Sequence, residues 1–250
     1  MSDRREFLLA TAGAAALAAA PASAQPASVA GGTEHWTVKR TPQGDVKLWM
    51  WRKRLADAPK GPLLFVHGSS AGALRVGLFA QRHPERIRRI VLDALVYTGE
   101  GSPTLAERKK RLPQYRASNR RPINRDFVRS IFTRDGNPDA YDPAVVERFA
   151  DQVLAMDDSM PTGTYVDMSA NLPVLDPAKI RVPTAILRGQ WDGIATDQDV
   201  INFFARLPNP DKQLTVMPGI AHTSLRSKNW RMVYDIVDAC CSRTAPVYTG

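Results

Sequence analysis

Apolar and polar residues along this chain alternate with a period of two in some stretches and with a helical period in others. His35–Arg40 and Asp45–Arg52 alternate residue by residue on either side of the turn signal Thr41-Pro42-Gln43-Gly44, which predicts an antiparallel hairpin. Leu63–Val66 is a short, wholly apolar run that is typical of a buried strand. Ala71–His83 then has helical spacing, so the pattern predicts a hairpin, a strand and a helix in that order.

A second buried strand is predicted over Ile90–Leu95, and the strand signals then disappear until about residue 177. Helices are predicted in this segment over Thr104–Tyr115, where Pro113 leaves a kink open, and over Arg125–Phe132 and Ala144–Met156. An all-helical block of this size between two sheet strands is most simply a cap inserted over one face of the sheet.

Alternation of strands and helices resumes in the last part of the chain. Strands are predicted over Thr184–Leu187 and Gln213–Met217, and helices over Thr196–Leu207 and Asn229–Cys241. The whole pattern predicts one α/β core in two parts, at residues 35–96 and 178–250, with a helical cap at 97–177. A polar linker is predicted at 25–34.

The first 24 residues form a targeting segment by their pattern. Arg4 and Arg5 precede an apolar run at Ala10–Ala20, and Ala22-Ser23-Ala24 matches a cleavage site. The segment resembles a twin-arginine export signal, which predicts a periplasmic or secreted protein without stable membrane insertion after the signal is removed. The alternative is an alanine-rich helix of the core.

Composition excludes few classes of protein. The chain has 250 residues, 44% of them hydrophobic and 24% charged, which is enough for one sizeable globular core. Its net charge of +9 is spread over four basic runs, at 52–54, 86–89, 108–111 and 119–125, that match no nucleic-acid motif. We interpret them as solvated faces and predict no nucleic-acid partner. We keep open the alternative that the chain is a basic protein that binds an anionic surface. Salt-dependent retention on nucleic acid or anionic lipid would reveal such binding.

Nucleophile chemistry is indicated where the predicted strand Leu63–Val66 meets the predicted helix. Gly68-Ser69-Ser70-Ala71-Gly72 fits the pattern G-x-S-x-G, in which glycines allow a sharp turn and the central serine hydroxyl is exposed. The turn also directs the N–H of Ala71 at the point where an oxyanion would form. Ser70 is therefore the candidate nucleophile, although such residues are also common in ordinary turns.

Candidate partners for Ser70 follow two later strands. Asp192 and His222 come just after predicted parallel strands, whose carboxyl ends meet at one edge of a sheet. His222 would take the Ser70 proton, and Asp192 would hold the imidazole in the required tautomer. Asp93 is the runner-up acid, because it also lies near a strand end. His35 and His83 do not follow such strands and are not candidates for the base. The adjacent Cys240 and Cys241 imply neither a disulfide framework nor a set of metal ligands.

The order Ser70, Asp192, His222 resembles the triad of the α/β-hydrolase superfamily. The segments around the three residues are similar too: His67-Gly68, Arg188–Asp192 and Pro218–His222 look like the family's oxyanion loop, acid turn and histidine loop. The resemblance covers almost all of residues 35–241 and is strongest to exported, esterase-like members. It implies an α/β-hydrolase fold, a carboxylic-ester or related acyl substrate, an oxyanion hole at Ala71 and Ser69, and no metal or organic cofactor.

One departure from the family concerns the spacing of these motifs. The oxyanion loop and the nucleophile turn usually belong to different strands with roughly 60 to 90 residues between them, but here they overlap at His67–Ser70. An internal deletion would explain this overlap, and it predicts a reduced, mostly parallel sheet. It also predicts a weak activity, since the N–H of Ala71 is the only oxyanion-hole donor that the sequence clearly indicates. A catalytically inactive remnant, either a binding protein or a deletion product, is the alternative. An exposed strand edge leaves a homodimer open.

Overall fold

The computed structural model describes residues 32–41, 44–53, 66 and 69–244. The chain divides into two compact units, residues 1–64 and residues 65–250, and each is described by itself. The predicted export signal and nearly all of the predicted strand Leu63–Val66 fall outside the described residues, and these predictions remain untested. Within the described part, no helix is long and apolar enough to cross a membrane.

The first unit contains the predicted hairpin. Strand β1 (Gly32–Thr41) pairs in antiparallel register with β2 (Gly44–Lys53), so that Trp36 lies opposite Trp49. Gly44 has a φ of +117°, a conformation that side chains rarely allow, which explains the glycine at the end of the turn. The prediction of a hairpin is confirmed, with strands a few residues longer than the alternation indicated.

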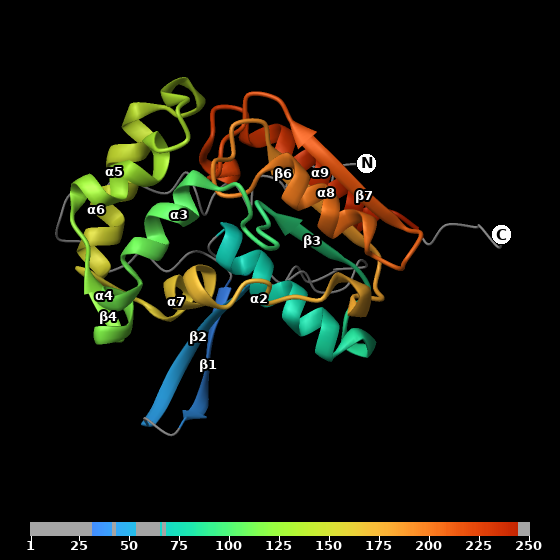
Figure 1. Cartoon of the computed structure of the whole chain (residues 1–250), viewed down its shortest axis with the longest axis horizontal. Coiled ribbons are helices and arrows are strands. Elements are labelled where there is room, and N and C mark those ends of the chain that lie inside the picture. Colours follow the sequence, from blue (N-terminus) through green and yellow to red (C-terminus); the bar gives the residue numbers. More distant parts are fainter. Residues whose placement is uncertain (1–31, 42–43, 54–65, 67–68, 245–250) are drawn as a thin grey trace. The chain divides into compact units, whose positions relative to one another are not determined.

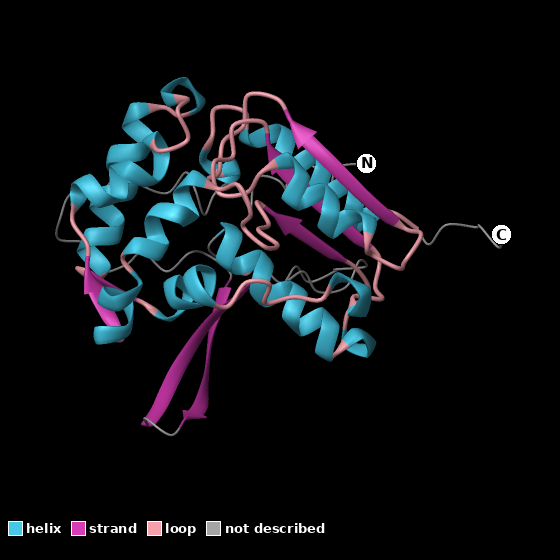
Figure 2. Cartoon of the chain, in the orientation of Figure 1, coloured by secondary structure: helices cyan, strands magenta, loops and turns pink. Residues whose placement is uncertain are grey.

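The second unit is built on a parallel sheet of three strands in the order β3-β6-β7 within the described residues (Figures 1 and 2). These strands are β3 (Ile90–Asp93), β6 (Thr184–Gly189) and β7 (Lys212–Met217). The central strand β6 is buried at every position, as expected for a parallel strand covered on both faces. This sheet confirms the predicted α/β class with a mostly parallel core.

Three helices cover this sheet: α2 (Ser69–Arg82), α8 (Asp197–Ala205) and α9 (Trp230–Ser242). The core contains fully buried side chains from strands and helices alike, among them Leu92, Ile186, Val200 and Phe203. Helix α2 begins two residues before the predicted start, which places Ser70 inside its first turn. Strand β3 ends at Asp93 instead of Leu95, because Ala94 adopts a φ of +53° and leaves the extended conformation.

A block of short elements connects β3 to its parallel neighbour β6. Its helices are α3 (Pro103–Lys110), α4 (Leu112–Ala117), α5 (Arg125–Thr133), α6 (Pro143–Met156) and α7 (Gly163–Ala170). Helices α5 and α6 pack side by side (Figure 1) around Phe132 and Tyr141. Side chains that accept from backbone N–H groups begin three of these helices: Ser102, Asn124 and Asp142. Among the described residues of the second unit, the 3₁₀ turns are η1 (Pro84–Arg86), η2 (Pro138–Ala140), η3 (Pro177–Lys179) and η4 (Ser224–Arg226).

One prediction for this block was wrong. The block is not all helical, because β4 (Arg120–Pro122) and β5 (Ser159–Pro161) form a short antiparallel ladder. Strands of three residues are too short to show a period in the sequence. The helix predicted over Thr104–Tyr115, with a kink at Pro113 left open, is broken at Arg111, since Pro113 lies in the first turn of α4, where it needs no intrahelical partner.

Candidate active site

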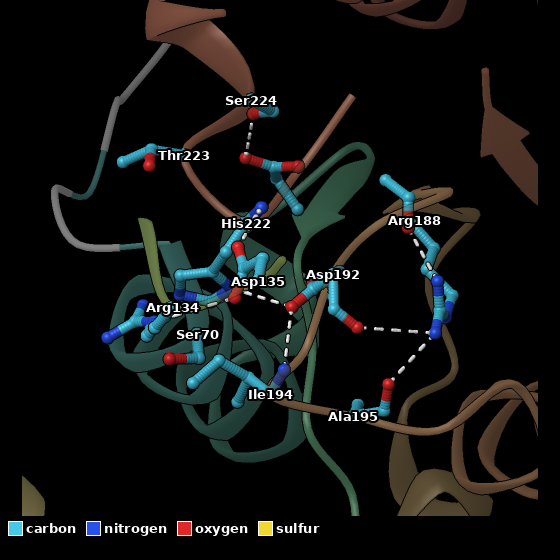
Figure 3. A network of polar contacts seen from close by, with 12 residues as sticks. Ser70, Arg134, Asp135, Arg188, Asp192, Ile194, Ala195, His222, Thr223 and Ser224 are labelled. Atoms are coloured by element: carbon cyan, nitrogen blue, oxygen red, sulfur yellow. Dashed lines mark hydrogen bonds and ion pairs between the residues drawn. The ribbon is translucent and has the colours of Figure 1, made fainter. Parts of the chain in front are cut away.

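Asp192 and His222 are brought together by neighbouring strands of the parallel sheet. Asp192 lies in the turn after β6, and His222 lies in the loop after β7. The His222 Nδ1 atom is 2.9 Å from Asp192 Oδ1 (Figure 3), and the two side chains are only 6% and 1% exposed. The predicted convergence of these two residues at the carboxyl edge of the sheet is therefore found as a hydrogen bond.

The electrostatic surroundings of Asp192 favour its ionised form. Burial acts to raise the pKa of this carboxyl, but the charge and hydrogen bond of His222 and the N–H of Ile194 outweigh it, so the pKa is lowered. The Ile194 N–H donates to Oδ1 over 2.9 Å. An ionised carboxylate can only accept a hydrogen bond, so Nδ1 of His222 must be the donor. A neutral imidazole therefore carries its proton on Nδ1, and Nε2 is left as the basic nitrogen.

The turn that carries Asp192 is shaped by a buried arginine and a glycine. Arg188 donates to the carbonyl oxygens of Gly189 and Ala195, over 2.5 and 2.9 Å. At Gly189 a Cβ atom would lie 2.6 Å from the carbonyl oxygen of Ile220, so only glycine allows this approach. The Trp191 N–H also donates to Ile220, over 2.9 Å. The acid turn and the histidine loop are thus packed backbone against backbone.

The inserted block also holds the histidine loop. Asp135, which follows α5, accepts the backbone N–H of His222 at Oδ2 over 2.9 Å (Figure 3). Tyr141 bonds both the hydroxyl and the N–H of Thr223, at 2.9 and 3.0 Å. Burial raises the pKa of Asp135. These contacts could not be predicted from the sequence, because they join residues more than 80 positions apart and no local pattern encodes them.

Asp93, the runner-up acid, has a different partner. Its Oδ2 accepts from the Ser224 hydroxyl over 2.6 Å, and its Oδ1 is buried without a hydrogen bond in the described part of the chain. Burial is the main cause that raises the pKa of Asp93 to about 6. The structure therefore places Asp192, and not Asp93, against Nδ1 of His222.

Ser70 is the second residue of α2, and its hydroxyl is buried. The hydroxyl lies 4.0 Å from the sulfur of Met168 in α7, and none of the hydrogen bonds found among described residues joins it to the His222 ring (Figure 3). Ser69 and Ala71 lie in the same helical turn, where the helix itself provides no acceptors for the backbone N–H groups. The positive end of the helix dipole also favours negative charge at this point.

Two surface hollows lie away from these residues. One of about 360 Å³ is lined by Tyr97, Leu175 and Arg206 among others, and one of about 490 Å³ by residues between Gly99 and Lys109. Neither hollow includes Ser70, Asp192 or His222. No group of three or more histidine, cysteine or acidic side chains suited to a metal ion occurs among the described residues.

Comparisons with known proteins agree with the architecture. A family model described as serine aminopeptidase, S33, matches residues 28–229. A crystal structure of the monoacylglycerol lipase of Paleococcus ferrophilus shares 19% identity over 70% of this chain and 66% of that one, with a TM-score of 0.52. The monoglyceride lipase of Saccharomyces cerevisiae, in complex with a substrate analogue, shares 16% over 70% and 63%, with a TM-score of 0.49. The chain thus spans less than two thirds of either lipase. No curated protein matches it.

Proposed function

The chain belongs to the serine aminopeptidase S33 family of α/β-hydrolases, and we propose that it hydrolyses a carboxylic ester or a related acyl compound through Ser70, His222 and Asp192. The observation that carries this proposal is the buried 2.9 Å bond between His222 Nδ1 and Asp192 Oδ1, together with the lowered pKa of that carboxyl. A histidine oriented in this way has a basic Nε2, which is the group that a serine nucleophile requires.

The reaction follows from these groups. Ser70 Oγ attacks the acyl carbon while its proton passes to His222 Nε2, and the imidazolium is stabilised by Asp192. The negative oxygen of the tetrahedral intermediate faces the N–H groups at the start of α2, with Ala71 as the main donor and Ser69 beside it. The intermediate collapses to an acyl-enzyme as Nε2 returns the proton to the leaving alcohol. Water then repeats the sequence and releases the acid.

One rearrangement is needed before this reaction begins. The Ser70 hydroxyl contacts the Met168 sulfur at 4.0 Å and must turn toward His222. A thioether is a weak acceptor, so little is lost when this contact breaks. Nucleophile–base hydrogen bonds are often long in free enzymes and tighten when substrate binds. We therefore expect substrate to complete the pair.

An inactive remnant of the fold is the second candidate. It is favoured by the missing Ser70–His222 hydrogen bond and by the chain's coverage of only 66% of the Paleococcus ferrophilus lipase. Such a protein would bind acyl compounds without cleaving them. The two candidates differ in one property, the activation of Ser70.

A fluorophosphonate probe tests this property without knowledge of the substrate. The purified protein is treated with the probe, and the adduct is mapped by mass spectrometry. We expect rapid labelling of Ser70 that is lost in Ser70→Ala and His222→Ala. His83→Ala, which removes a half-exposed histidine elsewhere in the same unit, is the matched control and keeps the labelling. A folded protein without label at Ser70 would favour the inactive remnant.

A further inference from the structure

Three half-buried arginines of the inserted block form a cluster. Arg108 lies in α3, Arg121 in β4 and Arg134 directly after α5. The guanidinium groups of Arg108 and Arg121 lie 5.0 and 4.5 Å from the centre of the same ring, that of Tyr165. Arg134 is close enough for its positive charge to lower the pKa of Arg108. We call these three residues the arginine cluster.

The donors of this cluster have few acceptors. Arg108 points an Nη1 at the sulfur of Met168 over 3.8 Å, and Arg121 points an Nη2 at the sulfur of Met160 over 3.2 Å. Thioether sulfur is a weak acceptor. Within the described ranges neither arginine has a carboxylate partner, and the Nε atoms of Arg121 and Arg134 are buried without a hydrogen bond.

The carboxylate nearest to the cluster is already engaged. Asp135 Oδ1 lies 3.6 Å from Arg134 Nε, but the other oxygen of this carboxyl accepts the N–H of His222. By contrast, the more exposed Arg125 and Arg129 of the same block share Glu147, at 3.0 and 2.7 Å. Arg108, which burial removes from water, therefore has a weaker acceptor than the paired arginines of the same block, the reverse of what a purely structural role would favour.

Positive charge is left over at this position. Burial is the main cause that lowers the pKa of Arg108, and the charges of Arg121 and Arg134 act in the same direction. The ring of Phe127, 4.2 Å from the Arg121 guanidinium, offsets part of the lost hydration. An aromatic ring cannot accept the planar fork of N–H donors that matches a carboxylate or phosphate group.

The cluster also lies next to the proposed nucleophile. One sulfur atom, that of Met168, separates the two groups: it is 3.8 Å from Arg108 Nη1 and 4.0 Å from Ser70 Oγ. A molecule that displaced this thioether would meet the Ser70 hydroxyl at one end and a guanidinium at the other.

We propose that the arginine cluster binds an anionic group of the substrate, so that the preferred substrate is an ester bearing a carboxylate or phosphate away from the scissile bond. This inference rests on the proposed function. Arg108 and Arg121 hold the anion directly, and Arg134 adds positive potential. The anion takes the acceptor position that two thioethers fill poorly in the free protein.

Two esters of equal acyl length test the proposal. The mono-4-nitrophenyl ester of adipic acid ends in a carboxylate, whereas 4-nitrophenyl hexanoate ends in a methyl group. We expect kcat/KM to be about tenfold higher for the anionic ester, mainly through KM, as one charge-assisted contact provides. In the double variant Arg108→Gln/Arg121→Gln this preference is lost, and Arg108→Lys keeps part of it. Arg116→Gln, an exposed arginine of the neighbouring helix α4, is the matched control and retains the preference.

The outcomes separate this inference from the proposed function. Labelling of Ser70 by a neutral fluorophosphonate with equal kcat/KM for the two esters overturns the anion site and leaves the hydrolase intact. If neither ester is cleaved, calorimetric titration with adipate and with inorganic phosphate tests the site directly. Binding that is lost in the double variant supports the anion site, and the tighter ligand tells carboxylate from phosphate. Absence of binding by both overturns it.

Discussion

The Asp192–His222 network and the arginine cluster lie in the same unit of the chain but differ in how completely their polar atoms are bonded. In the network, Nδ1 of the histidine, its backbone N–H and one carboxylate oxygen of Asp192 all have partners within 2.9 Å. In the cluster, the acceptors found for two guanidinium groups within the described part of the chain are thioether sulfur atoms. Bonded groups of this kind fix one geometry before substrate arrives, whereas unbonded donors gain their partners only from a ligand.

The strongest way to break this contrast is to remove the charge at the centre of the network. Asp192→Asn is expected to lower kcat for ester hydrolysis by about 10⁴, because the amide can donate to Nδ1 and stabilise the wrong tautomer. Asp93→Asn, which changes a buried carboxyl bonded to Ser224, is the control and is expected to lose far less. Steady-state rates on 4-nitrophenyl hexanoate measure both. A loss in Asp93→Asn as large as that in Asp192→Asn would contradict the assignment of the acid role to Asp192 alone.

Asp93 sharpens the comparison, because it lies beside the network and, like Asp192, has one buried oxygen without a hydrogen bond among the described residues, yet its pKa is shifted in the opposite direction. Its pKa is raised from 3.8 to about 6, so the folded protein keeps a proton over this range that the unfolded chain releases. The stability that this carboxyl contributes is present below about pH 4 and is lost as pH rises to about 6. The Asp93→Asn side chain cannot ionise, so the variant does not lose this stability. Its free energy of unfolding, relative to that of the wild type, should rise by about 3 kcal/mol between pH 4 and pH 7.

Urea unfolding of both proteins between pH 4 and 7 measures this difference. Glu85→Gln, at an exposed carboxyl of η1, is the control and should show no comparable rise. A constant difference between Asp93→Asn and the wild type across the window would contradict a raised pKa.

A smaller effect is expected where the inserted block meets the network. Asp135→Ala leaves the His222 N–H buried without an acceptor, which costs about 1 to 3 kcal/mol of unfolding free energy and loosens the histidine loop. Asp135→Asn keeps an acceptor oxygen and should restore much of the loss. Chemical denaturation measures the loss of unfolding free energy, and the rate of fluorophosphonate labelling at Ser70 reports the loosening of the histidine loop. A labelling rate unchanged in Asp135→Ala would show that this contact does not position the histidine.

The smallest effect is expected in the arginine cluster and has the opposite sign. Arg108→Met removes a guanidinium that the free protein satisfies poorly and replaces it by an apolar side chain of similar length. We expect the free energy of unfolding to rise by about 1 kcal/mol. Arg125→Met removes an exposed, paired arginine and should not stabilise. Thermal unfolding compares the two, and a clear loss of stability in Arg108→Met would mean that this arginine is part of the scaffold.

The parts of the molecule that the sequence predicted are those with a local signal. The apolar runs of β3, β6 and β7 identified the sheet, and because parallel strands share an edge, the residues after two of them were expected to meet. Asp192 and His222 do so. Ser70 was placed in a turn before a helix and lies in the first turn of α2. The deletion inferred from the overlapping motifs at His67–Ser70 stays a prediction, since His67 and Gly68 lie outside the described residues.

Other features depend on contacts between distant residues and could not be predicted. Asp135 is one of these, because nothing near it in the sequence indicates that its carboxyl accepts the N–H of His222. The arginine cluster draws its members from three separate segments; in the sequence, Arg108 and Arg121 belong to basic runs that resemble solvated faces, and Arg134 stands outside those runs. The ladder of β4 and β5 has no period of its own.

The long connection between adjacent strands β3 and β6 has a consequence for how the protein folds. Ile90 pairs with Thr184 across the whole inserted block, whereas β6 and β7 are joined by little more than one helix. Closing the longer loop costs more chain entropy, and contacts between distant residues form slowly. We therefore expect the strand–helix–strand unit β6-α8-β7 to form first and β3 to pair with β6 afterwards. The parallel sheet would then begin to form from the final third of the chain, so it could start to fold only after that part has left the ribosome.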